Sequence, residues 1–150
     1  MSGSQGATVA RRTIMVVDDW PSVCASIVYF LETCGYKALA ANSGQAAIDL
    51  ARQEHFDGVL LDVQMPVMNG FQTCTQLQAI ARERGQNFKV WFMTGVHYRE
   101  LKEDCEKAGA GAVFQKPFDW PQLLAELERG LASLPMRPGS DTESPALPSA

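Results

Sequence analysis

The chain has 150 residues, of which 46% are hydrophobic and 20% are charged, and its formal net charge at pH 7 is −4. This length and composition predict one soluble globular domain, and the negative charge excludes the basic surface that direct nucleic-acid binding requires. No apolar run approaches the roughly 20 residues that span a bilayer, and residues 1–6 lack the apolar core of a secretory signal, so we expect a cytoplasmic protein without a membrane anchor.

The chain divides into three expected segments. Residues 1–12 are small and polar and end in two arginines, which predicts a flexible N-terminal arm. Residues 13–134 carry the alternating pattern of a folded domain. Residues 135–150 contain four prolines among small polar residues, which predicts a disordered proline-rich tail.

Five short apolar runs alternate with five segments of helical pattern. The expected strands cover residues 13–17, 36–41, 58–62, 89–94 and 112–115. The expected helices cover residues 21–34, 44–53, 71–84, 98–108 and 120–133. Strands that alternate with helices in this way require right-handed crossovers, so they predict a parallel sheet covered on both faces, which is a doubly wound α/β fold. The sequence has no glycine-rich nucleotide loop, which argues against nucleotide binding.

We expect the cysteines and one histidine to have no chemical role. The cysteines show no Cys-x-x-Cys spacing and fall in helix-like segments, so we expect reduced, small apolar side chains rather than metal ligands or disulfides. They are Cys24, Cys34, Cys74 and Cys105. His55 follows the second expected helix, where we expect a solvated side chain rather than a ligand.

Polar residues stand at the carboxyl ends of four expected strands. In chain order they are Asp18 and Asp19, Asp62, Thr94, and Lys116. Parallel strands point their carboxyl ends to one edge of the sheet, so these side chains should line one crevice. Carboxylates this close repel one another unless a cation lies among them, and Mg²⁺ fits best because it prefers oxygen ligands.

A metal ion and an ammonium group beside an aspartate favour phosphoryl transfer. Neutralisation of the neighbouring charge makes one aspartate a competent nucleophile toward phosphorus, and Lys116 supplies a second positive group. The transition state spreads negative charge over three equatorial oxygens, which a metal, an ammonium and the Thr94 hydroxyl can stabilise. A single polar residue at a strand end is usually structural, but here the strand ends that line the crevice carry the whole set.

Four motifs together resemble the receiver domain of bacterial response regulators, the CheY-like family of two-component signalling, across about residues 13–134. Val16-Val17-Asp18-Asp19 is similar to the acidic pair of that family, and Thr94-Gly95 is similar to its switch hydroxyl. The phosphoacceptor loop of the family is similar to the segment Leu60-Leu61-Asp62-Val63-Gln64-Met65-Pro66-Val67-Met68-Asn69-Gly70. The lysine motif of the family is similar to Lys116-Pro117-Phe118.

The resemblance implies a flavodoxin-like (βα)5 fold with strand order 2-1-3-4-5 and a role in a phosphorelay. It implies that a histidine kinase or histidine phosphotransfer protein phosphorylates Asp62. The domain is then a phosphoacceptor that assists its own phosphorylation and dephosphorylation rather than an enzyme. By the same resemblance Lys116 contacts the phosphoryl group, Thr94 moves to hydrogen-bond it, and the Lys116-Pro117 bond is cis. The implied Mg²⁺ ligands are Asp18, Asp19, Asp62 and the backbone carbonyl of Gln64.

Two positions depart from the family pattern. The family usually has a tyrosine or phenylalanine three residues before its lysine, where this chain has Val113. Phe114 is one residue further along, which places its side chain on the opposite face of the strand. Trp20 follows the acidic pair, where the family has mostly polar residues, and we expect it to cover part of the crevice mouth or to pack over the first helix.

Two other functions fit part of the same pattern of residues. An aspartate-nucleophile phosphatase of the haloacid dehalogenase type also uses Mg²⁺ and a strand-end acid. It needs a second acid two residues after the nucleophile, where Gln64 stands, and the chain leaves no room for a cap domain. A receiver-like interaction module that is never phosphorylated usually lacks an acid or the lysine, and this chain keeps all of them.

The first expected helix has apolar residues on two sides. The stripe that should face the sheet contains Val23, Ile27, Phe30, Leu31 and Cys34. The opposite side carries Ser22, Ala25, Val28, Tyr29 and Glu32. A solvated helix face would be mostly charged, so this composition predicts a docking surface for the kinase or for a second copy of the domain.

Overall fold

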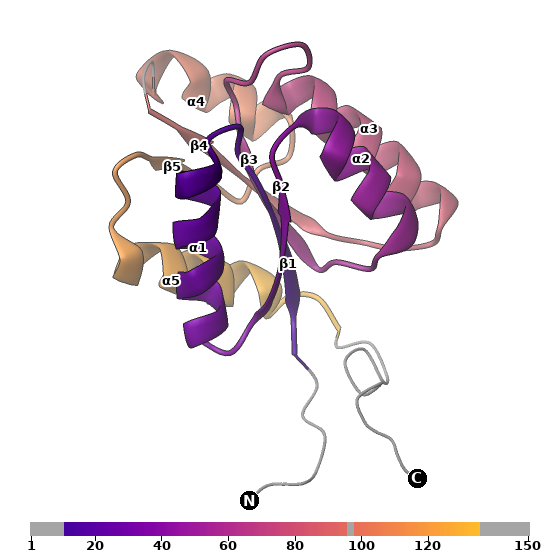
Figure 1. The fold of residues 1–150 in the computed structure, drawn as a ribbon, viewed down its shortest axis with the longest axis horizontal. Helices are drawn as coiled ribbons and strands as arrows, with labels where there is room; N and C mark the ends of the chain where they lie inside the picture. The colour runs from indigo at the N-terminus through magenta and orange to yellow at the C-terminus, as the bar shows by residue number, and fades with distance from the viewer. Residues whose placement is uncertain (1–10, 96–97, 136–150) are drawn as a thin grey trace, which may run out of the picture.

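One five-stranded sheet organises the part of the chain that the structure, a computed structural model, describes, namely residues 11–95 and 98–135 (Figure 1). Its strands are all parallel in the order β2-β1-β3-β4-β5, which confirms the doubly wound, flavodoxin-like α/β prediction. The strands are β1 (Thr13–Val17), β2 (Lys37–Ala41), β3 (Gly58–Asp62), β4 (Lys89–Thr94) and β5 (Ala112–Gln115). The helices are α1 (Pro21–Thr33), α2 (Gly44–Gln53), α3 (Gly70–Glu83), α4 (Tyr98–Lys107) and α5 (Trp120–Leu131).

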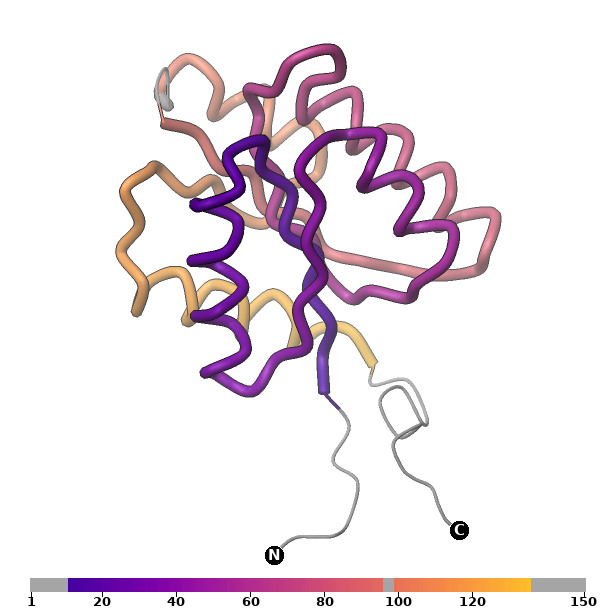
Figure 2. Tube along the Cα trace, viewed as in Figure 1, coloured from indigo at the N-terminus to yellow at the C-terminus, as the bar shows by residue number. Residues whose placement is uncertain are grey.

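The helices cover the two faces of the sheet as separate layers. Helices α2, α3 and α4 pack on one face, and α1 and α5 pack on the other, as the trace in Figure 2 shows. Successive residues of β1 alternate between the two cores, with Met15 and Val17 on the first face and Ile14 and Val16 on the second. All residues of β1 and β3 are buried, as expected for central strands of a sheet that is covered on both sides.

Side-chain caps fix where two of the helices begin. Ser43 Oγ accepts the backbone N–H of Ala46 at 3.0 Å and starts α2. Asn69 and Gln72 form a reciprocal capping box at the start of α3, with both side-chain-to-backbone distances at 2.9 Å. Such caps satisfy backbone donors that no helical carbonyl reaches. The α3 cap holds one end of the loop that follows Asp62.

Trp91, in the middle of β4, is enclosed by glycines from three other parts of the fold. A Cβ atom added at Gly58 on β3 would lie 2.6 Å from the Trp91 ring, and one at Gly130 on α5 would lie 2.7 Å from it. A Cβ at Gly111, in the turn before β5, would lie 3.1 Å from Trp91 Nε1. These separations are too short for an unstrained carbon contact, so the glycines make room for the indole.

The cysteines are all free, and one of them is in a different environment from the others. Cys24, Cys74 and Cys105 are buried, whereas Cys34 is exposed because α1 ends at Thr33 and Cys34 is its C-cap. Burial is the main cause that raises the pKa of the Cys74 and Cys105 thiols to about 11. These two thiols therefore stay protonated and unreactive at neutral pH.

The inward stripe of α1 differs from the prediction at three positions. Cys24, Ile27 and Leu31 are the buried residues of the helix, and Val28 is half-buried against the same core. These four follow the spacing i, i+3, i+4, i+7, which is one face of a helix. The predicted stripe was wrong to include Cys34 and to leave out Cys24 and Val28. On the outer side, Tyr29 is 75% exposed.

The histidine prediction was also wrong. His55 Nε2 lies 3.1 Å from Asp57 Oδ1, and the His55 side chain is only 14% exposed. Asp57 is itself buried at the start of β3, where its Oδ2 accepts the backbone N–H of Thr13 at 2.8 Å. The sequence pattern correctly placed His55 after α2, but it did not show that the side chain contacts the Asp57 carboxylate.

Arg12 joins the two ends of the described chain. We expected it to end a flexible arm, but its guanidinium donates hydrogen bonds to the carbonyl oxygens of Leu131 at 3.0 Å, Leu134 at 2.5 Å and Pro135 at 3.2 Å. This set of contacts, the Arg12 clasp, ties the start of β1 to the residues that follow α5. The rest of the predicted arm and tail, residues 1–10 and 136–150, lies outside the described residues.

Candidate functional site

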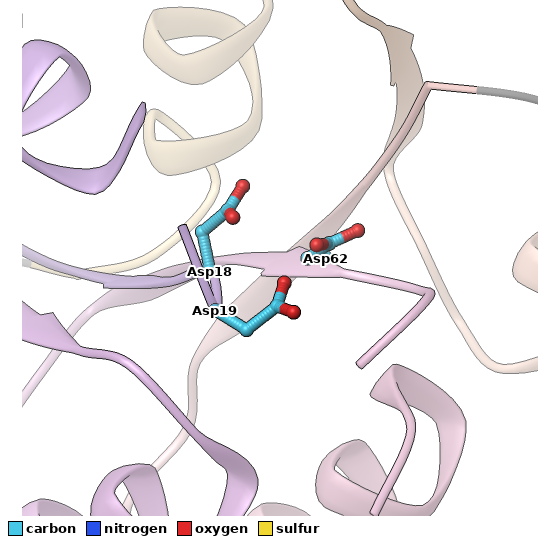
Figure 3. A group of neighbouring side chains, drawn as sticks. All are labelled: Asp18, Asp19 and Asp62. Atoms are coloured by element: carbon cyan, nitrogen blue, oxygen red, sulfur yellow. The ribbon is translucent and has the colours of Figure 1, made fainter. Parts of the chain in front are cut away.

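Three carboxylates meet at the carboxyl edge of the sheet. Asp18 directly follows β1, Asp19 is its neighbour, and Asp62 is the last residue of β3. One carboxylate oxygen from each lies within 4.8 Å of the others, and Figure 3 shows the three side chains gathered between the two strand ends. Asp18 is fully buried and Asp62 is 4% exposed. The sequence predicted this convergence, because parallel strands place their carboxyl ends together.

Backbone hydrogen bonds hold Asp18 in place. Its N–H donates to the Ala41 carbonyl at 3.1 Å, and its own carbonyl accepts Asn42 Nδ2 at 3.0 Å. Its side-chain Oδ1 accepts the backbone N–H of Trp20 at 2.9 Å. The carboxylate therefore keeps Oδ2 directed to the charged neighbour described next.

Lys116 brings a positive charge into the cluster from the end of β5. Its Nζ lies 2.5 Å from Asp18 Oδ2 and 3.6 Å from Asp62 Oδ2, and its side chain is 20% exposed. The Lys116 backbone N–H donates to the Thr94 carbonyl at 2.9 Å, which ties it to the end of β4. The Lys116-Pro117 bond is cis, as predicted. We call Asp18, Asp19, Asp62 and Lys116 the acidic crevice.

The surroundings of Asp62 disfavour its negative charge. Burial raises the pKa of its carboxyl from 3.8 to about 6, Lys116 opposes this by attraction, and the Asp18 carboxylate adds to it by repulsion. The backbone N–H of Gln64, 3.2 Å from Asp62 Oδ1, favours the charged form. Asp62 is therefore a carboxyl group that ionises closer to neutral pH than an ordinary aspartate.

The donor set of the crevice fits a hard divalent cation. Asp19 Oδ1 is buried and accepts no hydrogen bond from the residues that the structure describes. A buried acceptor without a donor is unusual, and a cation would satisfy it. Carboxylate oxygens are the ligands that Mg²⁺ prefers, and three are available within reach of one another.

A cleft of about 410 Å³ opens over the crevice. Its walls are Trp20, Val23, Asp62, Gln64, Gly95 and Lys116. Trp20 is 64% exposed and stands at the mouth, which agrees with the first of the two predicted placements. Thr94 is fully buried at the end of β4, so its neighbour Gly95, rather than Thr94 itself, lines the cleft.

A family model described as the response regulator receiver domain matches residues 14–128. The chain belongs to this family. Members of the family are typically phosphoacceptors rather than enzymes, and receiver domains partner with histidine kinases. The acidic crevice is typical of the phosphoacceptor site of a receiver domain, and it can hold a metal ion.

Several known proteins are similar to this receiver domain. The transcriptional regulatory protein ZraR of Escherichia coli is 35% identical over 134 residues, which are 89% of this chain and 29% of that protein. Protein PilH of Pseudomonas aeruginosa is 34% identical over 119 residues, which are 79% of this chain and 97% of that protein. The chain thus spans under a third of ZraR and nearly all of PilH.

Solved structures give the same assignment. The chemotaxis protein CheY4 of Vibrio cholerae superposes with a TM-score of 0.70 at 30% identity, over 80% of this chain and 98% of that one. A CheY-like receiver domain protein of Methanospirillum hungatei superposes with a TM-score of 0.72 at 25% identity, over 82% and 95% of the two chains. Among the described residues of this receiver domain, no helix is both long and apolar enough to cross a membrane.

The two neighbouring residues on β5 of the receiver domain face opposite cores, as predicted. Val113 is half-buried and packs in the core under α2, α3 and α4. Phe114 is buried in the core under α1 and α5, together with Trp91 and Met93. The position that usually carries an aromatic residue in this family therefore holds an aliphatic one, and the nearby ring lies on the other side of the sheet.

Two residues that support the crevice were not predicted as part of it. Asn42 donates its side-chain amide N–H to the Asp18 carbonyl, and its place just before the second expected helix gave no sign of this contact. Gly70 lies against the back of Asp62, since a Cβ atom added to it would be 2.4 Å from the Asp62 carbonyl oxygen and 2.8 Å from Val63 Cα. Asn-Gly is a common turn dipeptide, but nothing local to Asn69-Gly70 reveals which backbone it approaches.

Proposed function

We propose that this receiver domain accepts a phosphoryl group on Asp62 from a histidine kinase or histidine phosphotransfer protein, as one step of a phosphorelay, and changes conformation to signal to a partner. The observation that carries the proposal is the acidic crevice. A carboxylate at a strand end is accessible from a cleft, lies 3.6 Å from an ammonium group, and has two further carboxylates beside it. This combination is what an aspartyl nucleophile for phosphorus needs.

Each residue of the acidic crevice has its own role in phosphoryl transfer. An oxygen of Asp62 forms a bond to phosphorus, the bond from phosphorus to the donor nitrogen breaks, and the donor histidine leaves with that electron pair and takes up a proton. Lys116 attracts the phosphoryl oxygens, and Thr94 would move to hydrogen-bond them through its hydroxyl. Asp18, Asp19, Asp62 and the Gln64 carbonyl would hold Mg²⁺, which when bound neutralises charge on the transferred group. The same residues would assist hydrolysis of the aspartyl phosphate.

The alternative functions lack support from particular residues. A phosphatase of the haloacid dehalogenase type requires an acid where Gln64 stands, and Gln64 is exposed at the cleft wall. A receiver-like module that is never phosphorylated has no need for Lys116 to be placed between two buried carboxylates. We therefore keep the phosphoacceptor as the proposal and the unphosphorylated module as its alternative.

The deciding experiment is the incubation of the protein with acetyl phosphate and Mg²⁺, followed by intact mass measurement. We expect the mass to increase by one phosphoryl group in the wild-type protein and in Asp104→Asn, an exposed control on α4. We expect no increase in Asp62→Asn. Equal phosphate on Asp62→Asn and the wild type would place the acceptor elsewhere, and the absence of any increase in the wild type would favour the unphosphorylated module.

We also propose that the phosphodonor protein docks on the N-terminal half and outer face of α1. A donor histidine that reaches Asp62 must enter the cleft whose wall includes Trp20 and Val23, so its protein covers the start of α1. The adjoining outer face presents Ala25 and Tyr29, both exposed, and Glu32 is the only charged residue of the helix. This surface suits an apolar partner helix more than solvent.

Charge added to this face tests the docking proposal. Ala25→Glu with Tyr29→Glu should slow phosphoryl transfer from a histidine kinase while transfer from acetyl phosphate continues. The control is Thr75→Glu with Gln76→Glu on the exposed side of α3. If the control slows kinase transfer equally, added charge alone is responsible. A homodimer through α1, which the sequence also suggested, would instead appear as a loss of self-association in the α1 variant.

The boundaries and location of the unit remain proposals as well. We propose a receiver domain at residues 13–134, flanked by an N-terminal arm at 1–12 and a proline-rich tail at 135–150. Arg12 and Pro135, the flanking residues next to the domain, are joined through the Arg12 clasp. We also propose a cytoplasmic location, because the proposed partner, a histidine kinase, uses the ATP of the cytoplasm.

A further inference from the structure

A row of aromatic rings leads away from the acidic crevice along the α1–α5 side of the sheet. Lys116 continues through Pro117 to Phe118, whose ring centroid lies 5.5 Å from that of Trp120 at an interplanar angle of 60°. The Trp120 ring lies 4.7 Å from Phe30 on α1 at 41°. We call Phe118, Trp120 and Phe30 the aromatic row. These distances are those of rings in direct contact.

The aromatic row has open space beside it. A cleft of about 440 Å³ lies between α1 and the connection that follows β5, with walls that include Ile27, Lys116, Phe118 and Trp120. A second groove of about 530 Å³ continues along α1 past Tyr29 and Phe30 and shares Trp120 with the first. Close-packed cores leave side chains little freedom, so rings that border these spaces can change position at lower cost than rings inside the core.

On the opposite face, the described ring pair Phe71–Phe92 belongs to α3 and β4, and neither ring stands on the segment that carries Lys116. Val113 is the residue of β5 that faces the core under α2, α3 and α4, and its short aliphatic side chain is half-buried there. Phe114 points to the α1–α5 side. Among the described residues, the contacting rings that follow Lys116 closely in the sequence therefore lie on the α1–α5 side.

Phosphorylation changes the balance of charges that hold Lys116. In this structure its Nζ is closer to Asp18, at 2.5 Å, than to Asp62, at 3.6 Å. A phosphoryl group on Asp62 adds negative charge and carries it outward into the cleft, while a cation beside Asp18 would compete for that carboxylate. Both changes draw Lys116 toward Asp62, and the backbone that bears Phe118 is two residues away.

We propose that Lys116 transmits phosphorylation of Asp62 to the outer surface of the domain through the aromatic row, so that the α1–α5 groove changes shape with phosphorylation. This inference rests on the proposed function, because it requires a phosphoryl group on Asp62. The two states it connects are Lys116 held mainly by Asp18 and Lys116 held mainly by the phosphoryl group. Phe118 follows the lysine through the backbone link of two residues, and the other rings follow Phe118 because they are in contact.

The three tryptophans allow a direct test. The protein is labelled with 5-fluorotryptophan, and the resonances of Trp20, Trp91 and Trp120 in ¹⁹F NMR spectra are assigned by Trp20→Phe and Trp120→Phe variants. On addition of acetyl phosphate and Mg²⁺, we expect the Trp120 resonance to shift in proportion to the phosphorylated fraction that intact mass measures. The Trp91 resonance, from a ring that is 1% exposed in the core, should not move.

Removal of one ring isolates the row. Phe118→Leu and the volume-conserving Phe118→Met should be phosphorylated as the wild type is, while the shift of Trp120 falls to less than half. The matched control is Phe71→Leu, which removes a half-buried ring that contacts Phe92 at 5.1 Å on the other face of the sheet and should leave the Trp120 shift intact. An unchanged Trp91 resonance verifies that each variant is folded.

The outcomes separate the two proposals. If the mass shows one phosphoryl group and the Trp120 resonance does not move, the aromatic row is not the route and the proposed function stands. The same holds if Phe118→Leu and Phe118→Met respond as fully as the wild type. If the wild-type mass does not increase, the proposed function fails and the inference fails with it.

Discussion

Asp62 carries its negative charge at a place where the surrounding fold disfavours that charge. Its folded-state pKa of about 6 lies above the ordinary value of 3.8, so the folded state binds this proton more tightly than the unfolded state does. The contribution of Asp62 to stability is fully present below about pH 4 and is lost as the pH rises through about 6. Without Mg²⁺, the charged carboxylate should therefore destabilise the domain at pH 7 to 8.

Asp62→Asn should reveal this cost. The full shift corresponds to about 3 kcal/mol, and solvent screening at the cleft reduces this to on the order of 1–2 kcal/mol. We expect Asp62→Asn to raise the free energy of unfolding by that amount at pH 8 without Mg²⁺ and to give little gain at pH 4, measured by urea unfolding. Addition of Mg²⁺ should stabilise the wild type more than the variant. A gain of equal size at both pH values would contradict the raised pKa.

Lys116 has a role that can be separated from folding. Lys116→Ala should keep the fold and Mg²⁺ binding but slow phosphorylation by acetyl phosphate by roughly tenfold or more, because the variant lacks the ammonium that attracts the phosphoryl oxygens. Lys107→Ala is the control, since that lysine is exposed on α4 and pairs only with Glu103 at 3.6 Å among the contacts described. A rate for Lys116→Ala equal to that of the control would remove Lys116 from the transfer step.

At the scale of single elements, the start of α3 is built against the phosphoacceptor strand. Gly70 approaches the Asp62 carbonyl so closely that a methyl group has no space, and the neighbour it would meet is backbone, which cannot turn aside. Gly70→Ala should lower the free energy of unfolding by roughly 2 kcal/mol or more and also slow phosphorylation, because α3 must move away from Asp62.

Asn69→Ala is the matched variant for Gly70→Ala. It removes only the side-chain cap of α3, so it should cost about 1 kcal/mol and leave the phosphorylation rate close to that of the wild type. Urea unfolding and intact mass measure both effects in the same samples. If Gly70→Ala and Asn69→Ala lose stability and rate to the same extent, the close approach of Gly70 has no special importance for Asp62.

Local patterns allowed most elements to be predicted to within one or two residues. Strand ends were the strongest signal, because an apolar run that stops at an acid or hydroxyl shows both the strand and its polar edge. Faces were harder to predict. On α1, the structure buries Cys24 and Val28 in place of the predicted Cys34. The helix has apolar residues on two sides, so its sequence does not decide which side faces the sheet.

Contacts between distant segments could not be predicted from the sequence. Asp57, which contacts His55, reads as a loop residue until β1 brings the Thr13 backbone N–H to its Oδ2. Asn42 reads as a cap until β2 and β1 bring it against the Asp18 carbonyl. In each case the partner is fixed by the sheet register, which periodicity does not encode.

At the scale of the whole molecule, Trp91 links β3, β4 and α5 through the glycines around it. Replacement of glycine by alanine inside a helix normally stabilises it by about 0.5–1 kcal/mol. At Gly130 the added Cβ would lie 2.7 Å from Trp91, so we expect Gly130→Ala to destabilise the domain by roughly 1–3 kcal/mol instead. Ala125→Gly, at an exposed site on the same helix, should show the ordinary penalty for glycine of about 1 kcal/mol.

A double-mutant cycle tests whether Trp91 causes the effect at Gly130. Trp91→Phe removes part of the indole, so Gly130→Ala should cost less in that background, with a coupling free energy on the order of 1 kcal/mol from urea unfolding. Additive effects of the two substitutions would mean that the alanine at position 130 is tolerated or rejected for another reason.

The Arg12 clasp has a consequence for how this domain can be tethered. It places the first residues of β1 and the carbonyls after α5 at the amino edge of the sheet, while Asp18 and Asp62 lie at the carboxyl edge. Because one guanidinium holds both ends of the described chain, these ends are anchored as one unit at the edge of the sheet opposite the cleft over Asp62.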